Sequence, residues 1–287
     1  MQASKRGLLA LVTVVALAIG GTALAANTGS FGDPTGDAGA GPDIASVSIA
    51  NDDAGTVTIR VALGDRTALG ANDELLVGID ADQNPDTGSF FYGTEFGFDL
   101  TGTQALFVRP TPSGNLDGAP APPSFQGSSA AGVATFTFKT SEVGMTPTSG
   151  FEIFAISGSA RGLDAAPDIR TVNHQLVAGT PRPVLGPDRR APVDLAIRTS
   201  GVHGKLVRLP YFAADGRGET ADTIQVYRGS KVIKKVAIRL SDTNPFFSYT
   251  VPWRVPKTVK GKLRFCVSSV DRAGNKSKRS CAALTIR

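Results

Sequence analysis

The sequence predicts an all-β protein made of two β-sandwich domains. Apolar side chains recur at every second position in short segments along most of the chain, an alternation typical of strands that bury one face. The 287 residues include 33 glycines and 18 prolines but only 7% aromatic residues, which favours short strands joined by turns over long helices. A chain of this length can also form two separate hydrophobic cores.

Residues 1–25 are predicted to be a signal peptide. Lys5 and Arg6 precede an apolar run from Leu8 to Ile19, and Ala23-Leu24-Ala25 supplies the small residues of a cleavage site. The apolar run is shorter than the ~20 residues needed to span a bilayer, which favours cleavage over an uncleaved membrane anchor. We therefore expect a secreted, extracellular bacterial protein without a transmembrane segment in its mature form.

Residues 31–178 are predicted to form the first sandwich. A last strand carries His174, and the loop from Asn51 to Gly55 joins the first two strands as a hairpin. The stretch 109–131 is rich in Pro, Gly and Ser and is expected to be a long surface loop. The alternating segments that define the other strands are 47–49, 57–63, 75–79, 96–100, 134–138 and 151–155.

An oxygen-rich loop follows the alternating segment 75–79. It offers carboxylates at Asp80, Asp82 and Asp86 and an amide oxygen at Asn84, and such oxygens can converge on one hard cation. We therefore expect a structural calcium site formed by these four residues. The loop departs from an EF-hand, because Pro85 stands at its sixth position and no glutamate stands at its twelfth. The alternative is a solvated turn rich in Asp and Asn.

Three motifs give residues 31–180 a resemblance to a known group of secreted modules. They are Asp33-Pro34-x-Gly36-Asp37, the hairpin Asn51-Asp52-x-x-Gly55, and the strand that runs into Asp80-x-Asp82-x-Asn84. This part of the chain resembles sandwich modules related to family 9 carbohydrate-binding modules and to the C-terminal module of glucodextranase-type enzymes. The resemblance implies a two-sheet sandwich, often calcium-stabilised, that has no catalysis of its own. The sugar-stacking tryptophans of that family have no counterpart here, since Trp253 is the only tryptophan.

Residues 179–192 contain four prolines and no periodicity, and they are predicted to be a semi-rigid linker. Residues 193–287 are predicted to form a basic immunoglobulin-like domain, because seven short alternating segments fall within about a hundred residues. Its closing turn, Asp271-Arg-Ala273-Gly274-Asn275-Lys-Ser277, resembles the last hairpin of bacterial immunoglobulin-like and fibronectin-type-III-like repeats. That resemblance implies a spacer or adhesive module.

Cys266 and Cys281 flank this turn symmetrically, so the pairing of their strands places them opposite each other. An oxidising compartment favours a cross-strand disulfide over two free thiols.

Charge is distributed unevenly along the chain. Up to Asp188 there are 9 Lys and Arg against 19 Asp and Glu, a net charge of −10; from Arg189 onward there are 21 against 6, a net charge of +15. An acidic lobe suits cation binding, and a basic lobe suits anionic glycans or envelope polymers, although both can also be plain surface solvation. Nucleic acid is not the expected partner of an exported protein.

No catalytic constellation is evident in the sequence. His174 and His203 lie in different predicted domains, and there is neither a Gly-x-Ser-x-Gly elbow nor a His-Glu-x-x-His motif. Glu95 and Asp99 are the best glycosidase candidates, but four residues of strand separate them by ~13 Å, more than a paired-carboxylate mechanism uses.

The sequence therefore predicts a non-catalytic binding protein of the cell envelope or of extracellular glycan. Two alternatives remain: a structural spacer or adhesin with a protein partner, and an unrecognised hydrolase that acts through Glu95 or Asp99.

Overall fold

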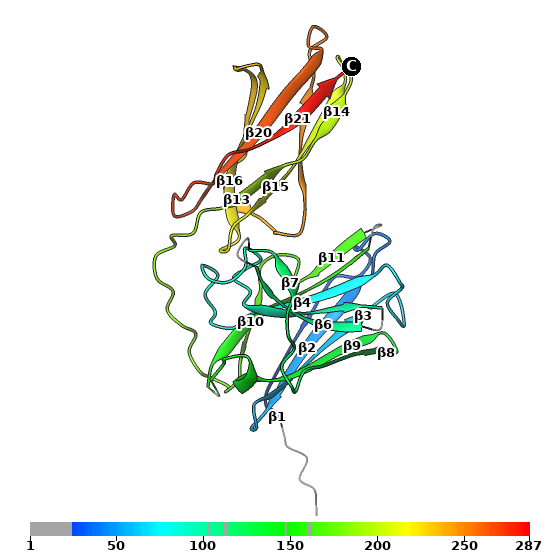
Figure 1. The fold of residues 1–287 in the computed structure, drawn as a ribbon, viewed down its shortest axis with the longest axis vertical. Helices are drawn as coiled ribbons and strands as arrows, with labels where there is room; N and C mark the ends of the chain where they lie inside the picture. Colours follow the sequence, from blue (N-terminus) through cyan, green and yellow to red (C-terminus); the bar gives the residue numbers. More distant parts are fainter. Residues whose placement is uncertain (1–24, 103, 112–113, 147, 160–161) are drawn as a thin grey trace, which may run out of the picture.

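A computed structural model describes residues 25–287 except 103, 112–113, 147 and 160–161. The described chain is built from strands, with one short 3-10 turn at Thr140–Glu142 (η1). It forms two sandwiches stacked end to end (Figure 1). The predicted all-β fold class is confirmed. The predicted signal peptide, 1–25, lies outside the described residues apart from its last position.

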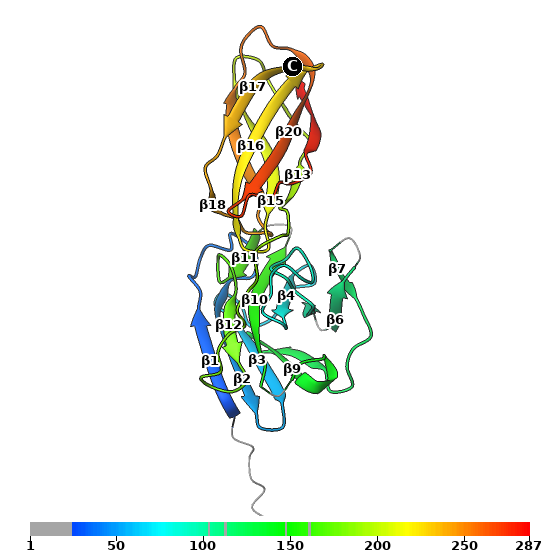
Figure 2. The ribbon, with the colours of Figure 1, turned by 90° about the vertical axis from the view of Figure 1, so that its left-hand side faces the viewer.

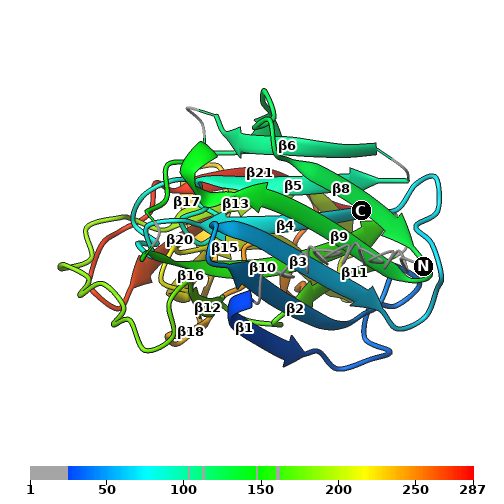
Figure 3. The same ribbon diagram turned by 90° about the horizontal axis from the view of Figure 1, so that it is seen from below.

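The first sandwich packs two antiparallel sheets against each other. One sheet has the order β1-β2-β3-β9-β8, and the other has the order β11-β10-β4-β5-β6-β7, with β12 also paired to β10. Figure 3 shows the two layers from below. The bounds of the first sheet are β1 Ala25–Gly32, β2 Ile44–Asp52, β3 Thr56–Leu63, β8 Gln126–Ala130 and β9 Val133–Lys139; those of the second are β4 Glu74–Asp80, β5 Phe96–Thr101, β6 Gln104–Pro110, β7 Leu116–Gly118, β10 Gly150–Ser159, β11 Gly162–Ala166 and β12 Val172–Gln175.

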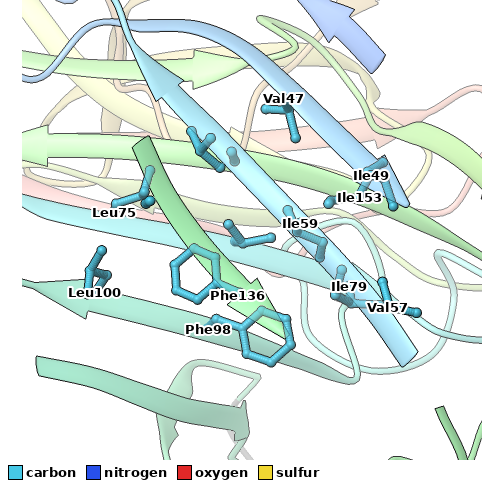
Figure 4. Packing of buried hydrophobic residues seen from close by; sticks show 14 of the residues in the cluster. Val47, Ile49, Val57, Ile59, Leu75, Ile79, Phe98, Leu100, Phe136 and Ile153 are labelled. Carbon is cyan, nitrogen blue, oxygen red and sulfur yellow. The ribbon is translucent and has the colours of Figure 1, made fainter. Parts of the chain in front are cut away.

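The alternating apolar residues of the strands form the core of the first sandwich. The alternating apolar residues of β2, β3, β4, β5 and β9 that point between the sheets are fully or almost fully buried (Figure 4). Phe98 lies at the centre, with its ring centroid 5.5 Å from that of Phe136 and 5.2 Å from that of Phe138. These contacts fix the position of β4 and β5, the strands on either side of the oxygen-rich loop.

The stretch 109–131 differs from its prediction as a long surface loop. It contains β7 and β8 as well as the end of β6, and β8 pairs with the edge of β9. Residues of β8 are small, polar and partly exposed, so this edge strand has no apolar alternation by which it could be recognised.

The second sandwich packs a three-stranded sheet, β13-β15-β19, against the sheet β14-β21-β20-β16-β17, with β18 paired to β16. Its first-sheet strands are β13 Val193–Ala196, β15 Leu206–Ala214 and β19 Tyr249–Arg254; those of the second sheet are β14 Thr199–Gly201, β16 Glu219–Arg228, β17 Lys231–Ala237, β18 Ser241–Asp242, β20 Gly261–Asp271 and β21 Ser280–Ile286. The core includes Leu209, Trp253 and Phe265. Two sheets of this size agree with the predicted immunoglobulin-like sandwich (Figure 2).

Cys266 on β20 and Cys281 on β21 are direct register partners and form a disulfide, as predicted. The apolar residues at the start of this domain behave differently from expectation. Val193, Leu195 and Ile197 are 42%, 55% and 37% exposed. The inward position between the first two belongs to Asp194, which accepts hydrogen bonds from the hydroxyls of Ser269 and Ser277 and so holds the strand with its apolar face outward.

The linker 179–192 has no regular secondary structure. The two sandwiches nevertheless touch, which a spacer between separate cores did not predict. Phe246, in the loop between β18 and β19, stacks on Phe91 with centroids 4.7 Å apart, and its centroid lies 5.0 Å from that of Phe154. A small apolar cluster around Tyr92 and Phe154 therefore bridges the domains.

Candidate metal centre

The loop between β4 and β5 brings three carboxylates together. Asp80 ends β4, Asp82 follows in the loop, and Glu95 lies directly before β5. One oxygen of each carboxylate lies within 4.8 Å of an oxygen of the others. The Glu95 backbone N–H donates to the carbonyl of Ile79 at 3.0 Å, so the hairpin register itself brings Glu95 beside Asp80.

Hydrogen bonds within the loop orient these carboxylates. The backbone N–H of Asn84 donates to Asp80 Oδ1 at 3.1 Å and to Asp82 Oδ1 at 2.9 Å. The Thr87 hydroxyl lies 3.2 Å from Asp82 Oδ1 and 2.9 Å from Glu95 Oε1, and the N–H of Ala81 donates to Glu95 Oε2 at 2.8 Å. The three groups are thus held in one place without a side-chain cation among the residues that bond to them.

Gly88 allows this loop to close on Glu95. Its φ is +56°, and a Cβ there would lie 2.4 Å from the carbonyl oxygen of Gly93 and 2.7 Å from Glu95 Oε1. A larger residue would push the loop away from the carboxylates.

Asp80 is the most deeply buried carboxylate of the group. It is 1% exposed, and its Oδ2 has no hydrogen-bond partner among the described residues. Burial, together with the charges of Glu95 and Asp82, raises the pKa of Asp80 to about 9, and burial raises the pKa of Glu95 to about 7. A buried carboxylate without a counter-charge is costly. A divalent cation would relieve both the burial cost and the repulsion.

The four residues predicted to bind calcium are divided by the structure. Asp80 and Asp82 lie in the carboxylate group, whereas the Asn84 side-chain oxygen accepts the N–H of Asp86 at 3.2 Å. The Asp86 carboxylate points to the second sandwich and pairs with Arg217 at 2.7 Å. Calcium binding by this loop therefore stays a prediction, and Glu95 is a candidate ligand outside the four residues predicted from the sequence. In the β4–β5 register Ile79 pairs with Phe96, so the next pair along the hairpin is Asp80 with Glu95.

This placement also separates the two glycosidase candidates. Glu95 belongs to the carboxylate group, while Asp99 pairs with Leu76 and Leu106 in the middle of the second sheet. The Asp99 pKa is raised to about 6 by burial and by the charge of Glu74. No interaction brings Asp99 to Glu95 in the part of the chain that the structure describes.

The surroundings of His174 suit a structural role, and the two histidines lie in different sandwiches. His174 is 3% exposed, its Nε2 lies 3.0 Å from Asn51 Oδ1, and burial lowers its pKa. His203 lies in the other sandwich, where its backbone N–H donates to the carbonyl of Arg287 at 3.0 Å.

The opening motif of the first sandwich forms a second acidic group. Asp33, Asp37 and Asp164 bring carboxylate oxygens within 4.8 Å of one another. The Asp164 oxygens accept the N–H groups of Ile44 and Ala165, and burial raises the pKa of Asp33 to about 7. Asp33 as a whole is partly exposed, unlike Asp80, although its Oδ2 is buried without a hydrogen-bond partner among the described residues.

Charge is segregated along the second sandwich, which the structure describes without a gap. Its acidic residues lie at the end next to the first sandwich, where β13 and β16 begin and β15 and β20 end: Asp194, Asp215, Glu219, Asp222, Asp242 and Asp271. The far end, which includes the C-terminus in Figure 1, carries exposed cations: Lys205, Arg228, Lys231, Arg254, Lys257, Lys260, Lys262, Arg264 and Arg287. None of these cations has an ion pair within 4.0 Å in residues 193–287. We call this surface the distal basic end.

Comparison with known proteins identifies no family. No family model matches the chain, and no curated protein matches it. The fold can be superposed on fibronectin(III)-like modules of Clostridium thermocellum CbhA with a TM-score of 0.26 and 11% identity, over 82% of this chain and 86% of that one. It can also be superposed on the tandem V-type regions of the chitin-binding protein VCBP3 with a TM-score of 0.24 and 12% identity, over 90% and 99% of the two chains. Scores this low establish no common function.

A PKD domain of an M14-like peptidase from a Thermoplasmatales archaeon gives a TM-score of 0.24 and 14% identity, over 33% of this chain and 92% of that domain. The resemblance of the first sandwich to family 9 carbohydrate-binding modules therefore stays a prediction. Among the described residues, no helix is long and apolar enough to cross a membrane.

Proposed function

We propose that this protein is a secreted, non-catalytic binding protein whose distal basic end holds an anionic polymer of the cell envelope or of extracellular glycan. The observation that supports the proposal is the charge segregation of the second sandwich. Cations without an ion-pair partner in residues 193–287 cluster at one exposed end, while every Asp and Glu side chain of that domain lies toward the other end. A surface of one sign attracts a polyanion over about a Debye length.

The distal basic end also has a surface suited to an extended ligand. Lys262 and Arg264 are exposed residues of β20, and the Arg264 guanidinium lies 5.0 Å from the centroid of the Tyr227 ring. This stacking keeps one cation flat against the sheet. The neighbouring Lys260 and Lys257 extend the charge beyond the strand end.

Two charge-reversal pairs test the proposal. In the first variant Lys260 and Lys262 become Glu at the distal basic end; in the control Lys278 and Arg279 become Glu at the opposite end. All four residues are exposed, so neither variant should change the fold. Heparin and a polyphosphate chain serve as probes, with Kd measured from 50 to 500 mM salt.

The first pair should weaken binding by at least tenfold at low salt, and the control should change it by less than about threefold. Wild-type binding should fall steeply as salt rises. Equal losses in both variants, or binding that ignores salt, would overturn the assignment of the polymer site to the distal basic end.

We further propose that calcium, held by Asp80, Asp82 and Glu95, is a structural cofactor of the first sandwich. A cation there would supply counter-charge to three carboxylates and fix the loop that faces the second domain. The support is the buried Asp80 oxygen without a partner.

The contact between the sandwiches favours the spacer alternative as a second candidate. Phe246 and the ion pair from Arg217 to Asp86 hold the two domains end to end, which suits a rigid extended module. A spacer would show no saturable binding to either polyanion while keeping this interface.

A further inference from the structure

A third group of carboxylates lies where the two sandwiches meet. Asp188 comes from the linker, Asp215 from the turn after β15, and Asp271 from the end of β20. One oxygen of each lies within 4.8 Å of an oxygen of the others. The group thus joins the linker to two loops of the second sandwich that are far apart in sequence.

One carboxylate oxygen of the buried residue Asp215 lacks a hydrogen-bond partner among the described residues. It is 3% exposed, and although its Oδ2 accepts the N–H of Arg217 at 2.8 Å, its Oδ1 has no hydrogen-bond partner in the described part of the chain. Burial and the charges of Asp188 and Asp271 raise the pKa of Asp215 to about 7. An orphaned carboxylate oxygen in such a group is the arrangement that a cation would satisfy.

The other two carboxylates are already oriented by hydrogen bonds. Asp271 accepts the backbone N–H of Asn275 at 2.8 Å and its side-chain amide at 2.7 Å. Asp188 Oδ1 accepts the N–H of Arg190 at 3.0 Å. These bonds preorganise the oxygens, so a cation would not have to order the chain itself.

The net charge around this group is compatible with one bound divalent cation. A fourth carboxylate, Asp86 of the first sandwich, lies nearby, since Arg217 contacts both Asp86 and Asp188. Arg217 and Arg190 face these carboxylates, and Arg272, which lines the same hollow, is already paired with Glu219 at 2.6 Å. Arg217 pairs with Asp86 at 2.7 Å and lies 3.6 Å from Asp188, and Arg190 donates to the carbonyls of Thr87 and Gly88. When all four carboxylates are ionised, four negative charges face two positive ones, and one divalent cation would neutralise the difference.

We propose that Asp188, Asp215 and Asp271 form a second cation site, which takes calcium or another hard divalent cation and fastens the linker to the second sandwich. A hollow of ≈ 290 Å³ lined in part by Asp188, Asp215 and Arg217 gives an ion access from solvent. The site is independent of the proposed polymer surface, which lies at the opposite end of the same domain.

The position of the site gives it a role in domain orientation. Gly216 follows Asp215, and a Cβ on it would lie 2.2 Å from the carbonyl oxygen of Pro85 in the first sandwich. The turn that carries Asp215 is therefore packed directly on the loop of the candidate metal centre. A cation that fixes this turn and Asp188 also fixes the angle between the domains.

Equilibrium dialysis of the mature full-length protein with radioactive calcium alone tests the site. Asp188→Asn removes a ligand from the linker and leaves both sandwiches unchanged, and Asp215→Asn removes the orphaned ligand. Asp53→Asn, in an exposed position of the first hairpin, is the matched control. Each site variant should bind one calcium fewer per chain than the wild type, and the control should bind the wild-type number.

The same variants distinguish this site from the first one. Asp82→Asn should also lose one calcium, and the double variant Asp82→Asn, Asp188→Asn should lose two. Calcium should slow tryptic cleavage after Arg189 and Arg190 at least fivefold in the wild type and in Asp82→Asn, but not in Asp188→Asn. If Asp215→Asn does not fold, Asp188→Asn decides alone. Unchanged stoichiometry and unchanged cleavage in Asp188→Asn would overturn the proposal.

Discussion

Asp80 is the residue on which the proposed cation site of the first sandwich depends most. Its side chain is buried at the end of β4, and the two carboxylates beside it come from the loop and from the residue directly before β5. Neither burial nor proximity alone would create a site. Together they produce a cluster whose ionised form needs a counter-ion.

Replacing Asp82 by Asn tests this cluster with little risk to the fold, because Asp82 is exposed. An ion that binds only the folded state stabilises it by about 2.7 kcal/mol at a hundredfold excess over Kd. We expect millimolar calcium to raise the Tm of the wild type, and Asp82→Asn to abolish most of that rise. Differential scanning calorimetry in calcium and in chelator measures it, with Asp53→Asn as control. An equal rise in Tm in the wild type and in Asp82→Asn would mean that the loop is a solvated turn.

Asp99, which lies outside the loop of the candidate metal centre, should make stability depend on pH. Its folded-state pKa of about 6 lies above its ordinary value of 3.8 because the side chain is buried. The folded state therefore holds the proton more tightly, and stability is full below pH 4 and falls as pH rises through 6. Asp99→Asn should raise the free energy of unfolding by about 1 kcal/mol at pH 8, after allowance for solvent screening, and leave it unchanged at pH 4.

Urea unfolding at the two pH values measures this effect. A variant with the same gain at pH 4 and pH 8 would show that packing, and not the charge of Asp99, is responsible.

Among the elements, the β20–β21 hairpin is cross-linked by the disulfide between Cys266 and Cys281. The disulfide closes a loop across a sequence separation of 15 residues. A closed loop of that length is worth about 3 kcal/mol in the chain-entropy model. Cys266→Ala with Cys281→Ala should lower the stability of the second sandwich by up to that amount.

Thiol labelling of unreduced, exported protein provides the matching chemical test. We expect no labelled cysteine in denaturant without reductant and two after reduction. Two labelled cysteines before reduction would contradict the disulfide.

Across the whole molecule, the domain interface joins the loop of the candidate metal centre to the second sandwich. Phe246 packs among Phe91, Tyr92 and Phe154, with ring centroids between 4.7 and 6.3 Å apart. Phe246→Ala removes most of this contact without touching either main core. The variant should show two resolved unfolding transitions and a larger radius of gyration in solution scattering than the wild type.

Phe125→Ala is the counterpart within the first sandwich, since Phe125 packs on the core phenylalanine Phe98 at 5.1 Å. It should lower stability without changing the angle between the domains. A radius of gyration in Phe246→Ala identical to that of the wild type would mean that the linker contacts alone hold the arrangement.

The fold class, most strands and the disulfide could be predicted from the amino-acid sequence. The physical reason is that these are local or periodic properties. A strand that buries one face must alternate, as in 57–63 and 75–79, and a symmetric pair of cysteines about a tight turn must meet when the strands pair. Asp80 and Asp82 could be found for the same reason, because they lie two residues apart at a strand end.

Contacts between distant segments determine which carboxylate oxygens lie close together and which apolar side chains face water. Glu95 joins Asp80 through strand pairing, Asp86 is drawn away by Arg217 from a domain more than a hundred residues later, and Asp188, Asp215 and Asp271 converge from three separate segments. Val193 and Leu195 alternate like core residues but point outward because Asp194 is held inside by two serines. Such outcomes depend on contacts between distant segments, which a periodic pattern does not encode.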